Sequence, residues 1–201
     1  MNGGRTCVIA TAALLLAACA SPASRFYTLT GAAPAAATAG PSVAVGPVSI
    51  PAVVDRPEIV VTVAPNEVWP DEFNRWAAPL SDGIGQALAQ NLAAGLKSPR
   101  VTLALAASGE AEYRVAVEVQ RFESVPGSHA LFDAAWTVRR SRDGASTAGR
   151  TTVRETVGDG SYESLAAAHS RAVGQLGADV TRALTGLPAG APPRPTPSPA
   201  S

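Results

Sequence analysis

Two stretches of the chain carry apolar residues at helical spacing. In the first, they recur every four positions, at Leu80, Ile84, Leu88, Leu92 and Leu96, so they share one face of a helix. Ser98-Pro99 ends this segment because proline cannot continue a helix. The second stretch, Ser161–Leu184, opens with a serine that can act as a cap. Its apolar face contains Leu165, His169, Ala172, Val173, Leu176, Val180 and Leu184. We predict one helix over each stretch.

Alternation of apolar and polar residues predicts strands between the two helices. The clearest segments are Ala111–Val125, His129–Arg140 and Thr147–Val157, in which every second residue is apolar over part of the length. The alternation breaks at Arg121-Phe122, which indicates a β-bulge. Asp143-Gly144 is typical of a tight hairpin turn. These segments predict an antiparallel meander of three strands.

Shorter β-rich segments complete the expected order of elements. They are Ser42–Ile50, Glu58–Ala64, a short strand around Val68 and Trp69, and Val101–Leu105. We read Pro65–Leu80 as a turn, that short strand and a loop leading into the first helix. The order predicts an α/β domain with a mixed, largely antiparallel sheet, whose apolar surface the helices cover.

The N-terminus has the pattern of an export signal. Arg5 precedes an apolar run of about 11 residues, whereas a membrane-spanning helix needs roughly 20. A short apolar run that ends in small residues is typical of a signal peptide, here residues 1–18. The four residues Leu16-Ala17-Ala18-Cys19 resemble a bacterial lipobox. That resemblance implies cleavage before Cys19 and lipidation of its sulfur. The alternative is an ordinary signal peptide with a chance cysteine.

Composition divides the rest of the chain. Residues 19–41 are rich in Ala, Gly and Pro and are expected to form the lipidated N-terminus and a linker, and residues 42–185 one folded domain. The Pro-rich tail, 186–201, is expected to be disordered. Ala20 follows the cysteine where inner-membrane lipoproteins often carry Asp, so resemblance to sorted lipoproteins favours the outer membrane.

The charge balance argues against two kinds of partner. The chain has 16 basic and 16 acidic residues and a formal net charge of zero. Nucleic-acid binding needs clustered Lys and Arg to neutralise phosphates, and electrostatic attachment to anionic lipids needs a polybasic segment. Neither is expected here.

Sequence motifs for catalysis, metal binding or cofactor binding are missing. The chain has two histidines and no HExxH, CxxC, G-x-S-x-G or Walker pattern. His169 lies on an apolar helix face and is expected to be packed there. Asp71 and Glu72 are adjacent carboxylates, which a glycosidase would need to place across a cleft. We predict a protein that is not an enzyme and holds no metal or cofactor.

Two segments combine the features of a binding surface. Asp55 and Arg56 lie between prolines, and a later stretch mixes aromatic and charged residues. Aromatic residues and Arg are enriched at interface hot spots. The alternative is that the tryptophans anchor the core and that Arg75 bonds a carboxylate such as Asp55 or Glu72. Both interpretations remain open for the later stretch, which contains Trp69, Phe73, Arg75 and Trp76.

These segments resemble a known family, the PqiC-like lipoproteins or ABC-type transport auxiliary lipoprotein components. The resemblance covers RFYTL at Arg25–Leu29, VAVGPVSIPAVVDRPEIV at Val43–Val60 and EFNRWAAPLSDGIGQALAQNL at Glu72–Leu92. It also covers AAAHSRAV at Ala166–Val173. Two positions depart from the family pattern: Asn74 stands where many relatives carry His, and Ala78 where many carry Glu.

The resemblance implies both a fold and a role. The implied fold is a three-layer α/β/α sandwich like the N-terminal domain of TolB. The implied role is that of an outer-membrane lipoprotein in an envelope lipid transport system, where it docks a periplasmic MCE-domain protein and can assemble into homo-oligomeric rings. Three rivals stay open: an activator of a cell-wall synthase, a carrier with its own lipid cavity, and a cryptic hydrolase.

Overall fold

The computed structural model describes residues 22–33, 39–104 and 111–187. The predicted signal peptide, Cys19 and most of the Pro-rich tail lie outside these residues. The elements run in the order β1 (Arg25–Tyr27), β2 (Val43–Ser49), β3 (Glu58–Ala64), β4 (Glu67–Trp76), α2 (Leu80–Leu96), β5 (Val101–Leu103), β6 (Tyr113–Val125), β7 (His129–Arg140), β8 (Ser146–Thr156) and α3 (Tyr162–Gly186).

The strands form two sheets. Five strands make the larger sheet, in the order β5-β2-β6-β7-β8. Its β2 pairs in parallel with β5 and β6, and β6, β7 and β8 form the expected antiparallel meander. The register of β6 against β7 shifts between Val119 and Arg121, which confirms the predicted bulge. The mixed α/β class is therefore confirmed.

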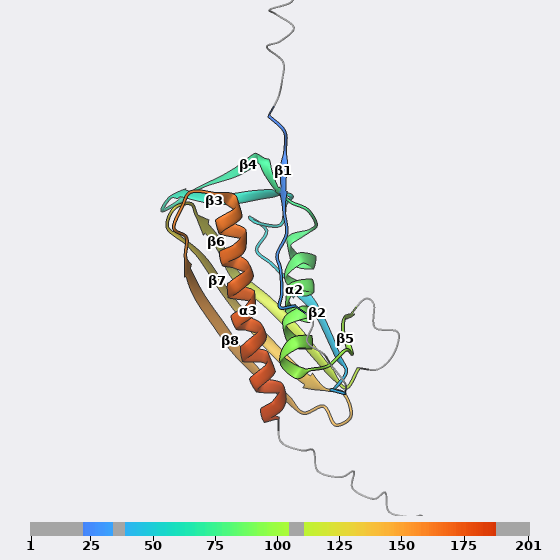
Figure 1. Cartoon of the computed structure of the whole chain (residues 1–201). Helices are drawn as coiled ribbons and strands as arrows, with labels where there is room; N and C mark the ends of the chain where they lie inside the picture. Colours follow the sequence, from blue (N-terminus) through green and yellow to red (C-terminus); the bar gives the residue numbers. More distant parts are fainter. Residues whose placement is uncertain (1–21, 34–38, 105–110, 188–201) are drawn as a thin grey trace, which may run out of the picture.

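Both helices lie on one face of the larger sheet, side by side (Figure 1). α2 packs on β2 and β5, and α3 packs on β7 and β8. The helices fall where the periodicity predicted them. Ser161 caps α3, because its hydroxyl accepts a hydrogen bond from the backbone N–H of Ser164 at 3.1 Å.

The smaller sheet has the order β1-β4-β3 and forms the end of the domain from which the N-terminal chain leaves (Figure 1). β1 lies inside the range expected to be linker, and it pairs in parallel with β4 through Arg25–Asn74, Phe26–Arg75 and Tyr27–Trp76. β4 is ten residues long, where the sequence indicated a short strand and a loop. The linker between Cys19 and the folded domain is thus much shorter than expected.

Aromatic rings join the two sheets in the core. Trp76 at the end of β4 packs edge-on against Phe122 of β6, with ring centroids 6.1 Å apart. Phe122 stacks on His169 of α3 at 3.7 Å and meets Phe132 of β7 edge-on at 6.3 Å. These contacts position the smaller sheet on the larger one, and such pairs add about 0.5–1.5 kcal/mol each beyond area burial.

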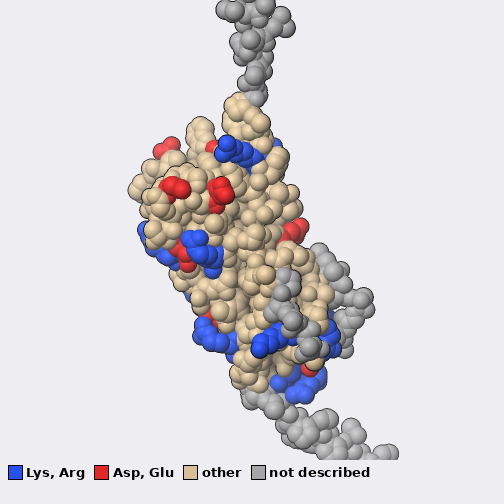
Figure 2. All heavy atoms as spheres, viewed as in Figure 1, with Lys and Arg blue, Asp and Glu red and all other residues tan. Residues whose placement is uncertain are grey.

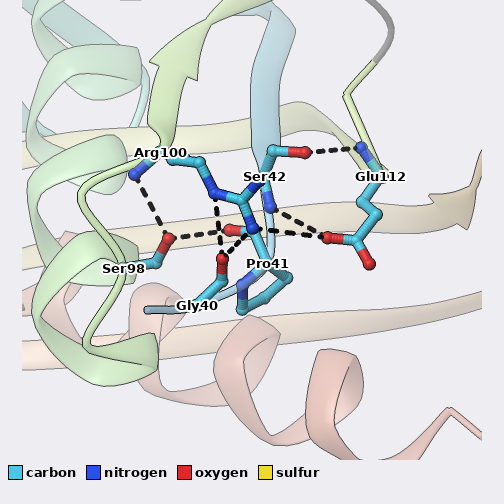
Figure 3. A network of polar contacts seen from close by, with 6 residues as sticks. All are labelled: Gly40, Pro41, Ser42, Ser98, Arg100 and Glu112. Atoms are coloured by element: carbon cyan, nitrogen blue, oxygen red, sulfur yellow. Dashed lines mark hydrogen bonds and ion pairs between the residues drawn. The ribbon is translucent and has the colours of Figure 1, made fainter. Parts of the chain in front are cut away.

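A polar network fixes the start of β2 at the opposite end of the domain (Figure 3). The Ser98 hydroxyl donates to the carbonyl of Pro41 at 2.8 Å, and the guanidinium of Arg100 donates to the carbonyl of Gly40. The backbone N–H of Ser42 donates to the carboxylate of Glu112, and the backbone N–H of Glu112 donates to the hydroxyl of Ser42. The chain that follows residues 34–38 is therefore held by the folded domain.

Candidate interaction surface

The six residues predicted at an interface lie in the smaller sheet or in the turn that leads into it. Glu58 connects two of them. Its carboxylate accepts hydrogen bonds from Arg56 Nε at 3.1 Å and from Arg75 Nη2 at 3.0 Å. The pKa of Glu58 is lowered by a hydrogen bond from its own backbone N–H and by these two guanidinium groups. The partner of Arg75 is thus Glu58, and not Asp55 or Glu72.

The aromatic residues divide into two groups. Trp76 is only 7% exposed and belongs to the core, whereas Trp69 is 60% and Phe73 is 38% exposed. Trp76 is therefore a core anchor. Trp69 and Phe73 are available to a partner.

A second network lies beside these residues, and the sequence did not reveal it. The Tyr162 hydroxyl of α3 donates to Asp71 at 2.7 Å, and the Tyr27 hydroxyl donates to the side-chain oxygen of Asn74 at 2.9 Å. Burial opposes ionisation of Asp71. Hydrogen bonds from Tyr162, Phe73 N–H and Asn74 N–H outweigh it and lower the pKa of Asp71. Asn74, despite its departure from the family pattern, makes a polar contact that holds β1 to β4.

Three apolar pockets surround the first turns of α2. A pocket of about 350 Å³ is lined by Asp55, Arg56, Pro57, Trp76, Ala77, Ala78, Pro79 and Leu80. A second, of about 380 Å³, shares Trp76, Ala78 and Leu80 with it, and a third of about 370 Å³ meets the second at Asp82 and Leu103. The side chain of Ala78 is exposed and small, so it leaves the first two pockets open.

The opposite end of the domain is basic. A shallow hollow of about 830 Å³ is lined by residues that include Lys97, Arg100, Arg140 and Arg142, with Glu112 among them. Figure 2 shows Lys and Arg side chains gathered toward this end of the molecule. The two ends of the domain therefore differ in chemistry.

The buried histidine and the adjacent carboxylates that the sequence singled out lie in separate surroundings. His169 is fully buried, bonds Ser124 at 2.9 Å and has its pKa lowered by burial to about 3. Asp71 is occupied by Tyr162, and Glu72 is exposed. Within residues 22–33, 39–104 and 111–187, no three His, Cys, Asp or Glu side chains group as metal ligands would. No helix in these ranges is long and apolar enough to cross a membrane.

A family model matches most of this chain. The model describes the ABC-type transport auxiliary lipoprotein component, and it matches residues 27–181. The family is one of transport components and not of enzymes. No curated protein matches the chain in sequence.

Two of the solved structures that match this chain share its fold at low sequence identity. A crystal structure of an uncharacterized protein is 16% identical, with a TM-score of 0.68 over 81% of this chain and 99% of the other. Protein XCC0632 from Xanthomonas campestris is 20% identical, with a TM-score of 0.61 over 81% of this chain and 94% of the other. A PelC dodecamer from Paraburkholderia phytofirmans is 18% identical and covers 72% of this chain and 92% of its own, at a TM-score of 0.41.

Proposed function

Since this chain belongs to the family of ABC-type transport auxiliary lipoprotein components, we propose that it is the outer-membrane lipoprotein subunit of an MCE-type lipid transport system. In this proposal Cys19 carries the lipid anchor, and the domain docks the periplasmic MCE-domain assembly without catalysing a reaction. The observation that carries the proposal is the family match over residues 27–181. It covers nearly the whole folded domain, and the lipobox-like segment stands directly before that domain.

The short distance between Cys19 and β1 favours docking at the membrane. Arg25 opens β1 six positions after Cys19, and an extended chain spans at most about 3.3–3.6 Å per residue. The domain is therefore held within about 20 Å of the anchor. A short tether raises the effective concentration for a partner that arrives at the membrane. An activator that reaches a synthase at the inner membrane needs a long linker, so the tether counts against that rival.

We place the docking surface at the pockets around the start of α2. They combine apolar walls with the Asp55-Arg56 turn, and apolar surface with a charged rim is typical of an interface. The substitution Ala78→Arg would put a long charged side chain between two of these pockets. Ala78 is exposed, so we expect the fold to tolerate the change and partner recovery to fall.

The test is crosslinking of the lipidated protein in its own host, followed by mild detergent extraction and mass spectrometry of the recovered partners. We expect an MCE-domain protein, recovered less with Ala78→Arg and less with Cys19→Ser. Ala148→Arg is the matched control, because Ala148 is an exposed alanine on β8. Recovery of a cell-wall synthase instead would move the protein to that rival class. Unchanged recovery with Ala78→Arg would show that the docking surface is elsewhere.

A further inference from the structure

We propose that the end of the domain formed by the smaller sheet rests against the phospholipid bilayer, with Trp69 in the zone of the lipid headgroups. This inference rests on the lipid anchor at Cys19 in the proposed function. It adds that the folded domain touches lipid through exposed side chains that do not line the pockets around α2.

The exposed apolar side chains gather at this end. Among the described residues, the exposed large hydrophobic side chains are Phe26, Val53, Val63, Val68, Trp69 and Phe73. Five of them belong to β1, β3 or β4, and Val53 lies in the turn that leads into β3. Exposed apolar residues scattered singly need no explanation, but a group on one small sheet marks a contact surface.

The anchor selects the bilayer as the occupant of this surface. The N-terminal chain leaves the domain at the smaller sheet (Figure 1). Pro22 and Ala23 line a pocket together with Phe73, so the chain toward Cys19 runs beside an exposed aromatic residue of the group. Because Cys19 lies within about 20 Å of Arg25 along an extended chain, acyl chains on Cys19 bring this end of the domain to the membrane.

The chemistry of the group fits a lipid interface. Tryptophan is enriched where membranes meet water, because its ring is apolar and its N–H is polar. β1, β3 and β4 carry two basic side chains and four acidic ones, namely Arg25, Arg75, Glu58, Glu67, Asp71 and Glu72. Attraction to anionic lipids therefore does not drive the contact, and we expect it to persist at high salt.

The chain carries its own reporter for this contact. Of its three tryptophans, Trp76 is 7% and Trp136 is 9% exposed, whereas Trp69 is 60% exposed. The lipidated protein would be reconstituted into phosphatidylethanolamine–phosphatidylglycerol vesicles that contain lipids brominated on the acyl chains. We expect bromine to quench the Trp69 emission and the remaining spectrum to match that of a Trp69→Phe variant.

Two substitutions that each introduce a carboxylate test whether this surface, and not another part of the domain, contacts the bilayer. Val68→Glu adds a carboxylate to the exposed apolar group, one position before Trp69 in β4 and at a residue that is 47% exposed, so the fold should persist while the quenching falls. Thr137→Glu is the control, because Thr137 is exposed on β7 of the larger sheet. We expect Thr137→Glu to leave the quenching unchanged. Equal quenching in both variants would overturn the proposal.

The outcomes distinguish this inference from the proposed function. If mass spectrometry of the purified protein finds no lipid on Cys19, the anchor and this inference fail together. If the lipidated protein floats with the vesicles but Trp69 is not quenched, only this inference fails. If Trp69 is protected from a water-soluble quencher without vesicles, the surface is covered by a second copy of the chain, and the bilayer assignment is wrong.

Discussion

His169 shows how a single residue sets the conditions under which this domain is stable. Its ring is fully buried between α3 and β6, stacks on Phe122, and has no hydrogen-bond partner for Nδ1. Burial in an apolar environment disfavours the charged form of histidine. The residue is therefore held neutral, and its protonation is linked to unfolding.

We predict that the free energy of unfolding falls as the pH drops below about 6.5. The pKa of His169 is lowered to about 3 in the folded state, so the unfolded chain takes up a proton first. The stabilisation is present above the unfolded pKa and is lost toward pH 3, at no more than about 1.4 kcal/mol per pH unit. Urea unfolding between pH 4.5 and 7.5 measures it.

The control is the double substitution His169→Leu with Ser124→Ala, which removes the histidine and the buried hydroxyl that bonds it. The free energy of unfolding of this variant should depend less on pH than that of the natural protein. His129 is kept in both proteins, so the difference reports on His169. Parallel profiles would show that His169 does not cause the pH dependence.

The two helices pack closely because glycine lies at their contact. A Cβ added at Gly177 of α3 would lie 2.6 Å from Cβ of Asn91 of α2, and one at Gly95 would lie 2.8 Å from the hydroxyl of Thr181. Glycine lowers helix propensity. The close approach of α2 and α3 explains why positions 95 and 177 carry glycine despite this cost.

We predict that Gly177→Ala destabilises the domain by about 1–3 kcal/mol, because a methyl group would force the helices apart. Gly174→Ala in the same helix is the matched control. A Cβ there would meet nothing within 4 Å, so we expect it to be neutral or to stabilise the domain by up to about 1 kcal/mol. Thermal unfolding of both variants tests the prediction, and a similar effect of the two would contradict it.

At this scale the sequence predicted most elements and missed those without periodicity. Both helices and the meander have long apolar patterns, so they could be predicted. β1 has three residues, too few for a pattern. β4 contains Pro70, which argues against a strand interior. The structure tolerates it because β1 pairs only with Asn74–Trp76, so β4 is an edge strand at Pro70.

The site residues follow the same rule: those marked by local composition could be predicted, and contacts between distant segments could not. Composition selected Trp69 and Phe73, which are exposed. It could not pair Arg75 with Glu58, because that contact follows from the register of β3 and β4. The Tyr162–Asp71 bond joins residues 91 positions apart, and no local pattern in the sequence indicates it.

For the whole molecule, the proposed anchor makes the length of the tether determine how often the smaller sheet would meet the bilayer. We predict that inserting 20 Gly/Ser residues between Ser21 and Pro22 weakens Trp69 quenching in the lipidated protein. Effective concentration falls roughly as the −3/2 power of tether length, or about ninefold here. Flotation with vesicles should not change, because the anchor is intact. Unchanged quenching would show that the domain binds lipid without help from its tether.

The hydrogen bonds that follow β1 determine which elements would bear a pull on the proposed lipid anchor. Backbone N–H groups just after β1 donate to side chains of both helices: Thr30 to Ser170, Gly31 to Gln90 and Ala32 to Asn91. If Cys19 carries the proposed anchor, tension on its acyl chains would pass through β1 into its partner strand β4 and into α2 and α3. The load would then be shared by the smaller sheet and the two helices, and it would not act directly on the edge strands of the larger sheet.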